Sequence, residues 1–201
     1  DFFNVVEMMK EKLHTVPLVI QLRVGAEGTF RGVINLISMV QITWNDESMG
    51  ADYTRGEIEE ELLESATEYR DKLIETLSDF DDALMELYLA EEPIDAATLH
   101  AAVRKTTCSF ALVPVMCGSA LKNKGIQPLL DAINAYLPSP LDVPPITGHH
   151  PETEAEIPIL PRKNDPLAAL IFKVAMIEGR RLSFARVYSG KLTAGSDVYN
   201  P

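Results

Sequence analysis

The residues best suited to chemistry form a polar loop, Gly118-Ser119-Ala120-Leu121-Lys122-Asn123-Lys124-Gly125. An apolar run precedes this polar loop and a segment of helical spacing follows it, so it lies at a strand-to-helix junction, where open α/β sheets bind ligands. It is not a phosphate-binding loop, because Gly-x4-Gly-Lys-Ser/Thr is absent. It can present backbone amides and a small side chain to a flat base, although an ordinary strand-to-helix turn has the same composition.

A second candidate is the strongly acidic region from Gly56 to Asp95. The chain has a formal net charge of −12, and this region holds 15 acidic residues against Arg70 and Lys72, so the rest is close to neutral. Such a surface repels nucleic acid, which argues against DNA binding, and it attracts basic partners. A solvated acidic face that has no partner is the alternative.

The two cysteines do not indicate a redox or metal site. Cys108 and Cys117 are nine positions apart, a spacing that fits neither a Cys-x-x-Cys pair nor a zinc site, so two reduced and packed thiols are expected. No apolar stretch approaches the ~20 residues that span a membrane, and no signal segment is evident. A cytoplasmic protein is the expectation.

Two further charged clusters give weak signals. Two adjacent histidines and three nearby acids could bind a metal, but an exposed linker seldom holds ligands rigidly, so no metal site is predicted. These residues are His149, His150, Glu152, Glu154 and Glu156. Arg180 and Arg181, at a predicted hairpin tip, either contact RNA phosphate or form a solvated turn.

Periodicity predicts the elements that precede the acidic region. Phe2 to Leu13 has one apolar face and is predicted to form a packed surface helix. The apolar and β-branched stretches Pro17 to Val24 and Thr29 to Trp44 are interrupted by glycines, which predicts strands joined by tight turns.

Three helices are predicted in the acidic region. Apolar residues spaced by three and four from Ile58 to Leu77 predict a long amphipathic helix that opens at about Glu57. Its outer face carries an acidic band, defined here as Glu60, Glu61, Glu64, Glu68 and Asp71. The predicted helix caps are Ser78 and Asp79 for a helix through Leu89, and Asp95 for one through about Thr106.

The rest of the chain divides at a proline-rich segment. Phe110 to Met116 predicts a buried strand of the parallel type, followed by the polar loop and a helix that stops before Pro138. Residues 139–166 predict a stiff, extended linker. The period then changes to two in residues 167–176, 182–188 and 197–199, as expected for the opening of an all-β domain. Both ends look cut, so a piece of a longer protein is expected.

Several strings resemble elongation factor G, a translational GTPase. The most specific matches are Cys117 to Gln127, Leu129 to Ile133 and Tyr136 to Pro144, with further agreement at Gly25 to Glu27, Trp44 to Asp46 and Arg186 to Gly190. The resemblance implies an α/β fold, a partial P-loop GTPase domain with an α+β insertion, followed by the first strands of an all-β barrel. It places the nucleotide domain at 1–138 with the insertion at about 17–106, the linker at 139–166 and the barrel from 167 to 201.

The resemblance also implies a role for the polar loop. In that family the motif matched by Ser119, Ala120 and Leu121 presents its backbone to the O6 edge of guanine, so GTP and GDP are the expected ligands. Adenine carries a donor amino group there, and an amide N–H therefore selects guanine. No Asp-x-x-Gly or Asn-Lys-x-Asp occurs in this chain, so Mg²⁺, the attacking water and the phosphate contacts are expected from outside it. The chain alone should not hydrolyse GTP.

Partners follow from the same resemblance. The insertion is expected to meet the stalk protein of the large ribosomal subunit through the acidic band, and the β segment to lean on ribosomal RNA, in a monomeric factor that drives translocation of tRNA and mRNA. The short hairpin from Ile177 to Arg181 resembles a divergent branch, which leaves ribosome recycling open. The alternatives are a release or ribosome-protection GTPase, and a non-enzymatic acidic binding module.

Overall fold

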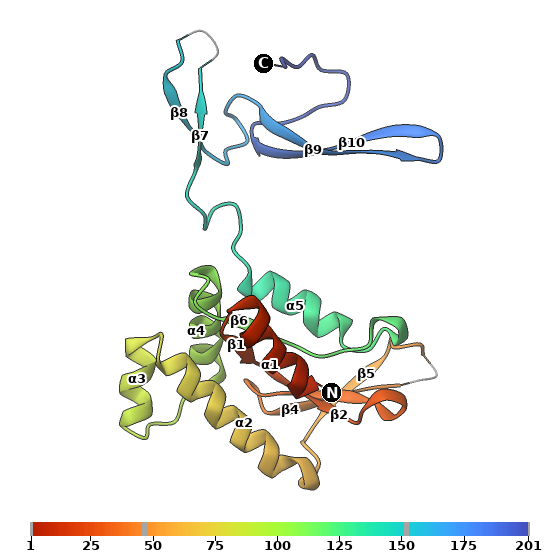
Figure 1. Cartoon of the computed structure of the whole chain (residues 1–201), viewed down its shortest axis with the longest axis vertical. Coiled ribbons are helices and arrows are strands. Elements are labelled where there is room, and N and C mark those ends of the chain that lie inside the picture. Colours follow the sequence, from red (N-terminus) through yellow and green to blue (C-terminus); the bar gives the residue numbers. More distant parts are fainter. Residues whose placement is uncertain (1, 46–47, 151–152, 201) are drawn as a thin grey trace. The chain divides into compact units, whose positions relative to one another are not determined.

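The computed structural model describes residues 2–45, 48–150 and 153–200. The chain divides into two compact units, Asp1–Leu137 and Pro138–Pro201 (Figure 1). No helix within the described ranges is long and apolar enough to cross a membrane.

The first unit is mixed α/β, as expected. In its described residues the α-helices are α1 Phe2–Leu13, α2 Glu60–Ser78, α3 Asp82–Leu89, α4 Ala96–Cys108 and α5 Ile126–Tyr136. The strands are β1 Pro17–Val19, β2 Gln21–Val24, β3 Gly32–Asn35, β4 Val40–Trp44, β5 Tyr53–Gly56 and β6 Val113–Val115. Two short 3-10 helices, η1 Glu27–Thr29 and η2 Ala120–Lys122, complete it.

Two sheets meet at a single residue of the first unit. β1 pairs in parallel with β6, and β2 begins an antiparallel sheet of order β2-β3-β4-β5. Ile20 lies between β1 and β2 and bonds to both sheets: its N–H donates to Val115 O at 3.1 Å, and its carbonyl accepts from Leu36 N at 3.1 Å. The parallel pair and the four-stranded sheet are therefore joined through one continuous stretch of backbone.

Strands β2, β3 and β4 of the four-stranded sheet contribute to two buried clusters, one on each face, whereas β5 is exposed. Alternating residues of β2 and β3, such as Leu22 and Ile34, belong to the large core that also includes residues of α2 and α4. On the opposite face Val33, Ile42 and Trp44 form a smaller cluster, against which Cys117 and Phe30 pack. This second cluster adjoins the polar loop.

The long acidic helix is confirmed, and one partly buried basic side chain, Arg70, lies on its inner face. Its inner face contains Leu73 and Leu77, which are at most 2% exposed. Arg70 lies on the same side and donates hydrogen bonds to the carbonyls of Leu36 and Ile37 and to that of Ile94. Burial lowers the pKa of Arg70 below its usual value.

The predicted cap of the next helix was wrong. α2 continues through Ser78, because Leu77 and Ser78 are buried and the Ser78 hydroxyl donates to Ile74 O within the helix. Asp81 is the cap of α3, since its carboxylate accepts from the amides of Ala83 and Leu84. Asp95 caps α4 as predicted, accepting from Thr98 N at 2.7 Å.

The strand that was predicted to be buried after α4 is shorter and more exposed than expected, since Val115 alone is buried within β6. Only Val113–Val115 forms β6, although its predicted parallel pairing is confirmed. Phe110 lies outside the strand in a left-handed turn and is 87% exposed, because α4 ends only two residues before it. The apolar run from Phe110 to Met116 therefore forms a turn and then a short strand, not one continuous strand.

In its described residues, 138–150 and 153–200, the second unit contains two hairpins. They pair β7 Ile146–His149 with β8 Glu156–Ile159, and β9 Ala168–Ile177 with β10 Arg180–Ser189. The first hairpin lies inside the segment predicted to be an extended linker, so that prediction was wrong there; Pro158 still pairs in register, opposite Thr147. The Glu178-Gly179 turn is confirmed, with φ of 49° and 74°, whereas no strand forms at residues 197–199.

One buried amide gives a stability prediction. The side chain of Gln21 is 1% exposed, and neither its nitrogen nor its oxygen has a hydrogen-bond partner among the described residues. An unpaired buried amide costs about 1–3 kcal/mol. Replacing Gln21 by leucine should therefore raise the free energy of unfolding by about 1 kcal/mol in urea denaturation followed by Trp44 fluorescence. A loss of stability would contradict this and mean that the amide is satisfied by solvent.

Candidate functional site: the polar loop and the acidic band

The polar loop is a compact turn closed by its own backbone. Ser119 N donates to Lys124 O at 2.8 Å, and Lys124 N donates back to Ser119 O at 3.0 Å. Between these residues η2 makes one turn, after which Asn123 takes the left-handed conformation with φ of 52°. The loop is thus closed by the paired backbones of Ser119 and Lys124.

Within this turn two adjacent amides point to no protein acceptor. The N–H groups of Ala120 and Leu121 form no hydrogen bond with any residue that the structure describes. Both residues are exposed, and the Leu121 side chain is 98% exposed. The arrangement can donate to an acceptor atom outside the chain, such as a carbonyl oxygen.

Gly125 allows the loop to enter α5 directly. Its φ is 88°, a conformation that L side chains rarely adopt, and a Cβ there would lie 2.9 Å from Cys117 O and 3.0 Å from the Gly118 Cα. The glycine therefore brings the end of the loop against its own beginning.

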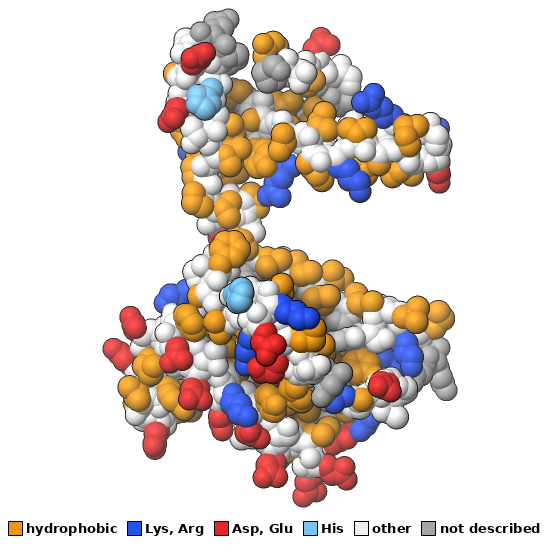
Figure 2. Space-filling view, viewed as in Figure 1, with side chains coloured by type: hydrophobic (Ala, Val, Ile, Leu, Met, Phe, Trp, Pro, Cys, Tyr) orange, Lys and Arg blue, Asp and Glu red, His pale blue; other side chains and the backbone are white. Residues whose placement is uncertain are grey.

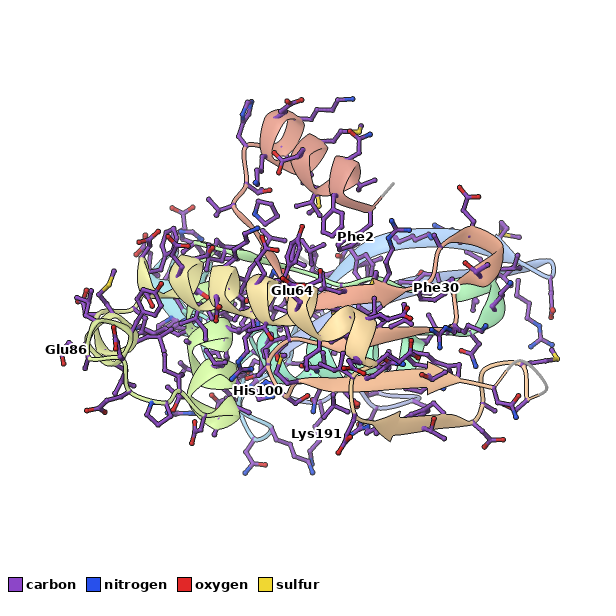
Figure 3. All side chains as sticks on the ribbon, turned by 90° about the horizontal axis from the view of Figure 1, so that it is seen from below. Phe2, Phe30, Glu64, Glu86, His100 and Lys191 are labelled. Atoms are coloured by element: carbon purple, nitrogen blue, oxygen red, sulfur yellow. The ribbon has the colours of Figure 1, made fainter. Side chains whose placement is uncertain are left out.

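The loop is also fastened to the four-stranded sheet by side chains. The Lys124 side chain is 1% exposed, and its Nζ donates to Phe30 O at 3.1 Å. Trp44 Nε1 donates to Gln127 Oε1 at 3.1 Å, and Gln127 Nε2 donates to Gly50 O at 2.9 Å. Figures 1 and 3 show the loop beside the end of the sheet at which Phe30 lies.

Both cysteines are free thiols. The Cys108 thiol lies 3.6 Å from Tyr136 O. Cys117 directly precedes the polar loop, and burial raises the pKa of its thiol to about 12, against a smaller opposing effect of Arg23. Cys117 is consequently a neutral packing residue at physiological pH, not a nucleophile.

The acidic band is exposed along the whole outer face of α2. Acidic side chains gather over α2 and α3 (Figure 2). Glu68 forms an ion pair with Lys72 at 2.6 Å, which offsets its charge, while Glu60, Glu61 and Glu64 form no ion pair with any described residue. Glu59, just before the helix, is not part of the band, because both its carboxylate oxygens bond to Arg31 at 2.6 Å. That contact lowers the pKa of Glu59.

Sequence reasoning missed four residues that hold the loop and the helix in place. Lys124 was taken as part of a polar loop, yet it is buried. The contact of Trp44 with Gln127 joins residues 83 positions apart, and no local pattern indicates it. Arg70 could have been found, since it lies four residues after Ala66 and three before Leu73, on the buried face.

The weaker candidates, the histidine cluster and the arginine pair, belong to the second unit. Among the described residues no group of three or more His, Cys, Asp or Glu could hold a metal ion, and Glu152 lies outside those residues. Asp46, from one of the motif matches, is also outside them. Arg180 and Arg181 begin β10 in the second unit and are exposed.

Comparison with known proteins identifies the class of protein. Over its whole length the chain is 47% identical to elongation factor G 2 of Syntrophus aciditrophicus (strain SB) and 46% identical to elongation factor G of Amoebophilus asiaticus (strain 5a2). It spans 30% and 28% of these relatives' lengths. The chain thus corresponds to a segment of a translation factor. The similarity covers the whole chain, so the resemblance to elongation factor G that the motifs indicated is confirmed.

The fold agrees with a solved structure. A crystal structure of a protein from Thermus thermophilus matches 98% of this chain and 26% of its own, with a TM-score of 0.70 and 23% identity. At that identity the match concerns the fold alone. No family model matches the chain.

Proposed function

We propose that this chain is part of a ribosome-dependent GTPase that drives the translocation of tRNA and mRNA during polypeptide elongation in the cytoplasm. The observation that carries the proposal is the 46–47% identity to two elongation factor G proteins across the entire chain. A GTPase domain that ends near residue 138 and a β-barrel that begins near residue 167 are parts of the same proposal.

Within that protein the polar loop would recognise the guanine base of GTP or GDP. The free N–H groups of Ala120 and Leu121 are adjacent donors, which fits the O6 acceptor of guanine and not the amino group of adenine. Ser119 closes the turn that presents them. Mg²⁺ and the phosphate contacts would come from residues outside this chain, because its sequence lacks the corresponding motifs.

The partners in the proposal are ribosomal. The acidic band would bind the basic face of the stalk protein. The second unit would contact ribosomal RNA, with Arg180 and Arg181 among the contacting residues. The factor would act as a monomer.

The proposal is tested by comparing the 201-residue chain with the whole protein encoded by its gene. We expect the whole protein to hydrolyse GTP faster when ribosomes are added, and the chain alone to give no measurable heat with GTP in titration calorimetry. The chain lacks the charge-assisted phosphate contacts that supply most of the affinity. Micromolar binding by the chain alone would contradict the division of roles, and a whole protein indifferent to ribosomes would contradict the function.

A further inference from the structure

Gln127, in the first turn of α5 directly after the polar loop, makes contacts with β4 and the turn after it that are more specific than packing requires. Gln127 accepts from Trp44 Nε1 at 3.1 Å and donates to Gly50 O at 2.9 Å. An indole N–H can only donate and a backbone carbonyl can only accept, so one orientation of the Gln127 amide satisfies both partners. The side chain therefore connects β4, the turn that follows β4, and the start of α5.

Burial makes this arrangement difficult to change. Trp44 is 3% exposed, and a buried indole N–H that loses its acceptor carries a penalty of about 1–3 kcal/mol. Lys124 is 1% exposed and bonds to Phe30 O, so the far end of the loop is held to the short segment that leads from η1 into β3. The loop cannot shift relative to the sheet without breaking these partly buried hydrogen bonds.

The backbone also leaves little room between the turn after β4 and the loop. A Cβ added to Gly50 would lie 2.6 Å from both Lys122 O and Asn123 O, and the φ of Gly50 is 77°. The backbone of the turn thus lies in close contact with Lys122 and Asn123, the two residues that follow the free amides of Ala120 and Leu121. The sheet defines where those amides lie.

We propose that the four-stranded sheet sets the guanine selectivity of the polar loop, with Gln127 as the positioning residue. The inference rests on the proposed function of the loop and adds a determinant outside it. The hydrogen bonds of Gln127 fix the loop, and the fixed loop places two N–H groups where only an acceptor on the base fits. Selectivity would therefore depend on residues that never touch the nucleotide.

The first test uses the 201-residue chain and needs no nucleotide. Replacing Gln127 by leucine removes both hydrogen bonds at similar volume, and we expect the amides of Ser119, Asn123 and Lys124 to exchange hydrogen about tenfold faster. Trp44 is the only tryptophan in the sequence, so its emission should shift in the same variant. Thr54→Val, on the neighbouring strand β5, is the matched control and should leave the loop unchanged.

The second test measures selectivity in the whole protein. The analogue is the diphosphate of 2-aminopurine riboside, which lacks O6, and selectivity is the Kd of this analogue divided by the Kd of GDP. This ratio should fall about tenfold in Gln127→Leu and remain unchanged in Thr54→Val. Trp44→Phe removes one hydrogen bond while it keeps an aromatic ring, and it should give a smaller change in the same direction. It also keeps the test decisive if Gln127→Leu does not fold.

The outcomes separate this inference from the proposed function. Unchanged exchange in folded Gln127→Leu would overturn the positioning role, and faster exchange with an unchanged Kd ratio would overturn the link to selectivity. If the unmodified whole protein bound no guanine nucleotide, the proposed function would fail, and the selectivity inference with it, whatever the exchange experiment showed.

Discussion

Replacing Arg70 by methionine should lower the free energy of unfolding of the first unit by about 3 kcal/mol. The guanidinium donates to three backbone carbonyls, those of Leu36, Ile37 and Ile94. Methionine preserves most of the apolar stem but leaves these acceptors without their donor, and a hydrogen bond to a charged group contributes about 1.5–3 kcal/mol. The effects are not fully additive, because the three bonds share one side chain.

Lys72→Met is the matched control, since it removes the other basic residue of α2. Lys72 pairs with Glu68 at the exposed surface, and such pairs contribute about 0–1 kcal/mol. Urea denaturation followed by Trp44 fluorescence measures both variants within the first unit. Equal, small effects of the two substitutions would mean that the Arg70 contacts add nothing beyond a surface charge.

Charge reversal on α2 should slow association with the stalk protein by an order of magnitude or more at low salt. Glu60, Glu64 and Glu68 are exposed members of the acidic band, and their substitution by lysine should leave the fold intact. A field of one sign steers a basic partner and raises the association rate by about 10–10³-fold. The wild-type rate should fall as salt rises, because charges are screened beyond ~10 Å at 0.1 M ionic strength.

Stopped-flow mixing with the purified C-terminal domain of the stalk protein, at two salt concentrations, measures these rates. The control reverses the exposed acids Glu154, Glu156 and Glu178 of the second unit, which changes the net charge equally. Comparable slowing in both triple variants would show that total charge, not the acidic band, governs association. A wild-type rate indifferent to salt would mean that the band is a solvated face.

The elements with a strong repeating pattern could be predicted from the sequence. α2 has apolar residues at helical spacing, and the Asp95 cap precedes α4 in the expected position. β5 was missed because Tyr53–Gly56 is exposed along its whole length and shows no alternation. The β7–β8 hairpin was missed because prolines disfavour strands, yet β8 is an edge strand, where a residue without an N–H is tolerated.

The candidate site could be located but not assembled from the sequence. Motif and position identified the polar loop, since both are local features. The contacts of Trp44 with Gln127 and of Lys124 with Phe30 join residues 83 and 94 positions apart, and only the folded chain brings them together. Lysine is almost never fully buried without a partner, so the burial of Lys124 could not be expected from its type.

The joint at Ile20 has a mechanical consequence. Because its N–H and its carbonyl bond to different sheets, no flexible hinge separates the parallel pair from the four-stranded sheet at this point. A displacement of the four-stranded sheet would therefore pass to the parallel pair through the two hydrogen bonds of Ile20 and the continuous backbone that carries them. Movement of one sheet against the other at this joint requires that at least one of these hydrogen bonds break.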